Sequence, residues 1–181
     1  EKLVDRLLAS PRYGERQGSL WLDIVRYADS DGYRADHFRP EAWRYRDYVI
    51  NSFNADKPYN RFVQEQLAGD EIDPGNRDAL VATMFLRHWI YEHNQRDVET
   101  QWSDILTDVT NVTADTFLGL GMQCARCHDH KFDPILQKDY YRMQAFFASM
   151  LPRATMPVGT VAERKKYLAA RNKWLAETDD L

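Results

Sequence analysis

The sequence predicts an all-α fold. Apolar residues recur at helical spacing along most of the chain, no stretch alternates with period two between hairpin turns, and prolines and glycines stand where helices should begin and end. The 181 residues are enough for one domain with one core. The expected helices cover about residues 2–9, 11–28, 40–53, 58–69, 77–86, 98–118, 137–150 and 162–176.

Prolines, a serine and a glycine set the bounds of the first helices. Ser10 is a suitable N-cap and Pro11 a suitable first residue for the second helix. After a polar loop, Pro40 begins the third helix; Pro58 begins the fourth and Gly69 ends it. The apolar face expected for the second helix consists of Trp21, Ile24, Val25 and Ala28.

The second half of the chain contains the longest expected helix. Residues 88–97 lack periodicity and indicate a loop, and a helix with a continuous apolar stripe follows over 98–118. Gly119 and Gly121 loosen its end. Prolines bound a linker at 152–157, and the last helix is charged on most of its faces.

One short motif carries its own chemistry. Residues 124–128 read Cys-Ala-Arg-Cys-His. In C-x-x-C-H, two thiols are spaced to add across the vinyl groups of a haem while the adjacent imidazole binds the iron. The motif predicts a c-type haem protein, with haem c attached covalently.

Two other uses of the cysteines stay open. Cys124 and Cys127 are the only two cysteines, so the chain has too few for a zinc site of four cysteines. Zinc could still be bound with histidines from elsewhere, and C-x-x-C could be a redox pair. A thioredoxin-like pair should follow a strand, whereas a helical pattern precedes Cys124.

Composition narrows the partners and the compartment. The net charge of −4 is mild and the basic residues are scattered, which argues against nucleic acid. No apolar run is long enough to span a bilayer. Because covalent haem attachment normally takes place outside the cytoplasm and the chain begins without Met, we expect a bacterial periplasmic or extracellular protein that has lost a signal or an upstream domain.

Several longer motifs, taken in order, resemble the planctomycete-type cytochrome c domain, a family of otherwise unknown function in large secreted bacterial proteins. They lie at residues 27–33 (YADSDGY), 43–50 (WRYRDYVI), 56–62 (DKPYNRF), 66–71 (QLAGDE) and 124–135 (CARCHDHKFDPI). The resemblance implies a haem-bearing module within a longer polypeptide, with no settled reaction. We therefore expect a haem domain over 1–150, and over 151–181 a linker and C-terminal helix leading to a further domain.

If haem is bound, Cys124 and Cys127 are the expected thioether anchors and His128 is the expected proximal iron ligand. Arg126 and Lys131 flank them and are either propionate partners or solvent-exposed charges.

The sixth iron position decides the function, and the sequence leaves four candidates. His130 follows the motif but is more naturally a residue that fixes its loop. His88 and His93 lie in the irregular loop, and Met143 could give a Met/His pair or fill the core. A strong sixth ligand favours electron transfer, whereas an open or weakly held position favours catalysis.

Calcium is a further cofactor to consider. Acidic residues gather in the loops, although not at EF-hand spacing, and such residues also cap helices and make turns. They are Asp29, Asp31, Asp36, Asp70 and Glu71.

Three functions follow from these expectations. The first is an electron-transfer module that serves a redox partner domain or protein. The second is a haem enzyme, peroxidase- or oxidase-like, with an open distal site. The third is a structural or sensory haem domain. We favour the first, because one attached haem without a recognisable distal acid/base motif is typical of an electron carrier.

Overall fold

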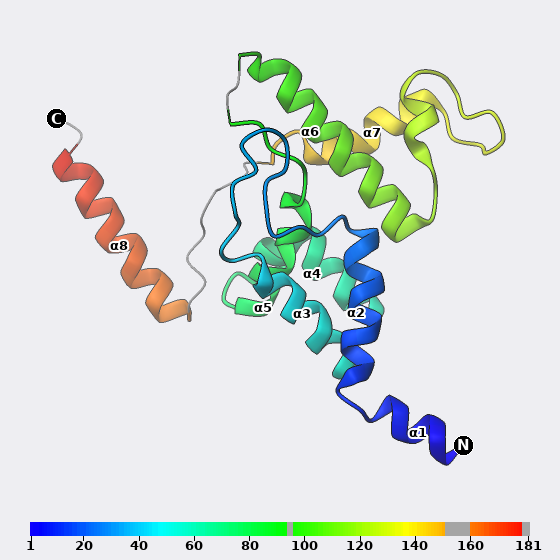
Figure 1. Ribbon diagram of the computed structural model, residues 1–181. Coiled ribbons are helices and arrows are strands. Elements are labelled where there is room, and N and C mark those ends of the chain that lie inside the picture. The colour runs from blue at the N-terminus through cyan, green and yellow to red at the C-terminus, as the bar shows by residue number, and fades with distance from the viewer. Residues whose placement is uncertain (94–95, 151–159, 179–181) are drawn as a thin grey trace.

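The computed structural model describes residues 1–93, 96–150 and 160–178 (Figure 1). In these ranges it contains helices and no strand beyond one isolated bridge between Ser30 and Phe38, so the all-α prediction is confirmed. The elements are α1 (Lys2–Leu8), α2 (Arg12–Ile24), α3 (Trp43–Asn54), α4 (Tyr59–Ile72), α5 (Arg77–Ala82), the 3₁₀ turn η1 (Thr83–Arg87), α6 (Val98–Thr113), the π turn η2 (Ala114–Leu118), the 3₁₀ turn η3 (Met122–Arg126), α7 (Gln137–Phe147) and α8 (Val161–Thr178).

Helices α2 to α5 and η1 enclose the larger core. Its buried residues are Val25, Tyr45, Tyr48, Val49, Phe62, Val81, Ala82, Phe85 and Val112. Close backbone approach builds it: a Cβ added at Gly69 of α4 would lie 2.1 Å from the carbonyl oxygen of Ala79 in α5. The buried Tyr45 hydroxyl donates to Gln66 at 2.6 Å, so its polar atom is satisfied inside the core.

Helices α6 and α7 lie side by side and form the rest of the domain (Figure 1). Two smaller cores lie along them. One contains Trp89, Ile105 and Val109, and the other contains Ala114, Met122, Ala125 and Tyr140. The second of these cores carries η3 and therefore the cysteine motif.

The end of α2 differs from the prediction. The helix stops at Ile24, which is exposed, whereas Val25 is buried. Arg26 adopts a positive φ of 54° and its guanidinium bonds Asp108 of α6, so the chain leaves the helical path before Ala28. The prediction that the apolar face of α2 runs on to Ala28 was therefore wrong, because the chain turns away at Arg26 to contact Asp108 of α6.

Two other helices are interrupted near their predicted ends. Helix α4 was predicted to end at Gly69. Instead it has a kink at Ala68 and continues to Ile72. The helix predicted over 98–118 is α6 followed by the π turn η2, which ends at the left-handed Gly119 with φ 63°.

Helix α8 follows the residues at 151–159, so the predicted linker at 152–157 lies outside the described residues. None of the helices in the described ranges combines the length and the apolar character that a membrane crossing needs.

Candidate functional site

The cysteines lie on a short turn that two other residues anchor in the core. We call residues 122–128 the thiol turn. Met122 and Ala125 are buried, whereas Cys124 and Cys127 are exposed free thiols. The turn follows the glycine-containing segment after η2, where the amide of Leu120 donates to the carbonyl of Ala114 at 3.3 Å. The sequence therefore holds the backbone from the inside and presents both sulfur atoms to solvent.

Helix α7 fixes the thiol turn from the other side. The carbonyl oxygen of Arg126 accepts from Gln137 Nε2 at 3.1 Å and from the Tyr141 hydroxyl at 3.0 Å. The backbone amide of Gln137 donates to Asp129 Oδ1 at 2.8 Å. Because these three bonds come from the first turns of α7, the position of the motif depends on that helix. This anchoring was not predicted from the sequence. The feature that could have indicated it is the spacing of Gln137 and Tyr141, which lie four residues apart and therefore on the same face of α7.

The imidazole of His128 has one nitrogen engaged and one open. Its Nδ1 lies 2.7 Å from the backbone carbonyl oxygen of Asp129. A carbonyl can only accept, so Nδ1 carries the proton and Nε2 keeps its lone pair. A histidine that binds a metal uses one nitrogen as ligand and orients the ring with a hydrogen bond from the other. The exposed His128 therefore has the tautomer that a metal ligand needs.

His130 braces the loop after the motif. Its Nδ1 accepts from the backbone amides of Asp133 at 2.9 Å and Phe132 at 3.3 Å, and its own amide donates to the carbonyl of Ile135 at 2.8 Å. Asp133 Oδ2 also lies 3.1 Å from that Nδ1. We assign Nδ1 as an acceptor, because two backbone amides donate to it. Nε2 is therefore the nitrogen that takes no part in these loop hydrogen bonds.

The other three candidates for the sixth position lie in different places. Met143 packs on the buried cluster that contains Met122 and Ala125, beside the thiol turn. His88 is buried against Tyr45, with ring centroids 4.6 Å apart. His93 Nε2 lies 2.8 Å from Asp31 Oδ2. The structure thus brings Met143 and His130 to the motif, and places His88 and His93 among residues of the first half of the chain.

His88 is electrostatically unlike an ordinary histidine. Burial, together with the positive charges of Arg26, Arg39 and Arg87, lowers its pKa to about 3. Its Nε2 has no hydrogen-bond partner among the described residues. His88 is therefore a neutral core side chain at physiological pH.

The predicted propionate partners are on the surface beside the motif. Arg126 is exposed, and Lys131 Nζ lies 5.2 Å from the ring centroid of Phe132, itself 84% exposed. Further exposed apolar side chains flank the thiols in the sequence: Leu118, Leu120, Leu136 and Tyr141.

The acidic residues considered for calcium have other partners or lie apart. Asp31 Oδ1 accepts from Arg39 Nε at 2.6 Å, and Asp36 Oδ1 accepts from the amide of Gly32 at 2.9 Å. Within the described ranges, no three His, Cys, Asp or Glu side chains are grouped to hold a metal ion.

The fold and the site define a class: an all-α domain that presents an exposed C-x-x-C-H turn at the junction of two helices. A family model, PSCyt2, described as a protein of unknown function (DUF1549), matches residues 1–151. The chain belongs to this family, the planctomycete cytochrome-like family that the sequence motifs indicated. Searches of curated proteins and of solved structures found no match.

Proposed function

We propose that this chain binds haem c covalently and serves as an electron-transfer module of a larger secreted or periplasmic polypeptide. Cys124 and Cys127 would supply the two thioether sulfurs, and His128 Nε2 would bind the iron. The observation that carries the proposal is the His128 imidazole, whose Nδ1–H is held by the carbonyl of Asp129 beside two exposed thiols.

The surroundings of the thiols fit a large apolar group. Both cysteines are exposed on a turn whose backbone is held by hydrogen bonds from α7 to the carbonyl of Arg126. The exposed Leu120 lies two residues before Met122, and the exposed Leu136 immediately precedes α7. Exposed apolar side chains of this kind are what a macrocycle would cover.

The haem would supply one-electron chemistry, and the protein would position it and tune its potential. Asp129 keeps the His128 ring oriented, which strengthens the imidazole as a ligand. Arg126 and Lys131 would place positive charge near the propionates. For the sixth position, Met143 and His130 are the candidates that lie beside the thiol turn.

Covalent attachment is tested by producing the chain in cells that carry a cytochrome c maturation system and recording the pyridine haemochrome spectrum after denaturation. We expect a spectrum with two thioether links. Cys124→Ser and Cys127→Ser should each remove one link, and the double variant should lose covalent haem. A matured wild-type protein without haem would overturn the proposal and return the motif to zinc or to a redox pair.

Electron transfer is tested on the native protein. We expect six-coordinate, low-spin iron whose Soret band does not change with cyanide. The paired variants Met143→Leu and His130→Ala identify the sixth ligand, because only the true ligand should shift the Soret band when removed. High-spin iron that binds cyanide and turns over peroxide would contradict the electron-transfer function and favour a haem enzyme.

A further inference from the structure

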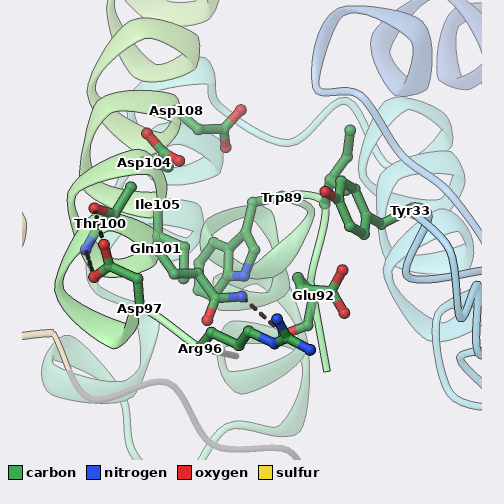
Figure 2. A pocket seen from close by; sticks show the side chains of 11 residues that line it. Tyr33, Trp89, Glu92, Arg96, Asp97, Thr100, Gln101, Asp104, Ile105 and Asp108 are labelled. Atoms are coloured by element: carbon green, nitrogen blue, oxygen red, sulfur yellow. Dashed lines mark hydrogen bonds between the residues drawn. The ribbon is translucent and has the colours of Figure 1, made fainter. Parts of the chain in front are cut away.

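A second candidate site lies at the opposite end of α6 from the thiol turn. A cavity of about 520 Å³ opens between the first three turns of α6 and the loops that carry Tyr33 and Trp89. In Figure 2, Asp104 and Asp108 stand on the α6 wall, Tyr33 stands across from them and Trp89 lies between. Its size and its mixture of aromatic, apolar and polar side chains are those of a small-molecule site.

Most polar groups of the cavity are already paired within the protein. The Asp108 carboxylate bonds Arg26 Nε at 3.0 and 3.1 Å. Asp97 caps α6 by accepting from the amide and the hydroxyl of Thr100, and Gln101 Nε2 donates to the carbonyl of Glu92 at 2.9 Å (Figure 2). These bonds fix the walls, so the cavity is formed before a ligand enters.

One carboxylate in the described lining has no such partner. Within the described ranges, no hydrogen bond or ion pair involves the carboxylate of Asp104, which is exposed on the α6 wall. Trp89 is only 3% exposed and its indole nitrogen is itself inaccessible, so its ring forms an aromatic wall of the cavity.

We infer that this cavity binds a small organic ammonium ion with an apolar or aromatic body. The ammonium group pairs with Asp104. The apolar body lies against Tyr33 and Ile90, whose side chains are 62% and 69% exposed in the cavity wall. A cation is favoured over an anion because carboxylates in the lining outnumber its single guanidinium, that of Arg96.

The inference does not depend on haem. Helix α6 has sixteen residues, which makes it about 24 Å long, and the thiol turn follows its far end. The two proposals can therefore fail separately, and binding in the cavity should be the same whether or not haem is attached.

The test uses the full chain labelled with ¹⁵N and two probes of nearly equal shape: 2-phenylethylamine, and 2-phenylethanol, which lacks the ammonium. We expect the first probe to shift the assigned indole N–H signal of Trp89, whose ring lines the cavity, and the amide of Asp104, with a Kd on the order of a few millimolar for a ligand of this size. The second probe should bind at least about fivefold more weakly.

Two variants on α6 separate specific from general charge effects. Asp104→Asn should weaken binding of the first probe at least about fivefold. The matched control is Glu99→Gln, which removes the same charge from an exposed residue of the same helix outside the cavity lining and should leave the Kd unchanged. Equal binding of both probes, equal affinity in the Asp104→Asn variant, or no shifts at about 20 mM probe would overturn the inference.

Discussion

Acid should destabilise this protein through His88 before it acts on most carboxylates. The side chain is buried against Tyr27 and Tyr45, and its pKa is lowered to about 3. In the unfolded chain the pKa of histidine is about 6.5. Between these values the unfolded state binds a proton that the folded state does not, so stability is complete above pH 6.5 and falls as the pH drops toward 3.

The expected size follows from the pH interval. Each pH unit within the window costs about 1.36 kcal/mol, so lowering the pH from 7 to 4.5 should cost about 2.7 kcal/mol through His88 alone. In His88→Leu this contribution disappears, because leucine has about the right volume and no proton to bind. The substitution also removes the unpartnered Nε2, so the variant should not be much less stable than the wild type at pH 7.

The assay is urea unfolding of the wild type and of His88→Leu at pH 7 and pH 4.5, followed by circular dichroism. Other groups titrate in both proteins, so the difference between their two pH effects isolates His88. Equal pH effects in the wild type and His88→Leu would refute the reasoning; if the leucine variant fails to fold, His88→Phe is measured instead.

Backbone packing and the anchoring of the thiol turn give further predictions. Gly69→Ala should cost about 3 kcal/mol in the free energy of unfolding, because its Cβ would lie 2.1 Å from the backbone oxygen of Ala79. Gly121→Ala is the matched control, because a Cβ there would have nothing within 4 Å, and it should change the free energy of unfolding by less than about 0.5 kcal/mol. Equal effects of the two substitutions would contradict the packing. Tyr141→Phe removes one of the bonds to the Arg126 carbonyl and should cost about 1 kcal/mol while speeding amide hydrogen exchange in the thiol turn, and an unchanged exchange rate there would show that the bond does not hold the turn.

The sequence predicted the helices best where a residue acts locally. Pro58 is the N-cap immediately before α4, and Gly119 ends the helical run of α6 and η2. Both effects are local, because the proline ring restricts φ of its own residue and glycine tolerates a positive φ. The end of α2 could not be predicted in the same way. Arg26 leaves the helix to reach Asp108, a residue 82 positions later, and no local pattern encodes that contact.

In the candidate site, too, local features could be predicted from the sequence and contacts between distant residues could not. Both cysteines and His128 belong to one short motif and could be identified as candidates from its spacing, whereas their exposure is seen only in the structure. The partners of His88 and His93 could not, because Tyr45 and Asp31 come from elements far away in the sequence. An irregular loop indicated that these two histidines were available, whereas tertiary packing buries one in the core and places the other against the Asp31 carboxylate.

The positions of the histidines reduce the candidates for the sixth iron ligand of the proposed haem from four to two, which gives a last prediction. His88 is buried in another core and His93 is paired with Asp31, so Met143 and His130 are the candidates that lie beside the thiol turn. Of these, His130 has Nδ1 occupied by two backbone amides and braces its own loop, so moving it toward the iron would break that loop.

Met143 could move without breaking the His130 loop, because its thioether only packs on the neighbouring cluster and its side chain has three rotatable bonds. A Met/His pair raises the reduction potential relative to two histidines. In a redox titration of the haem-loaded chain, Met143→His should therefore lower the potential while the iron stays low-spin, and His130→Ala should leave the potential almost unchanged. The opposite result, with the potential unaffected by Met143→His and altered by His130→Ala, would assign the ligand to the loop and would mean that the Asp133 and Phe132 amides release the imidazole when haem is attached.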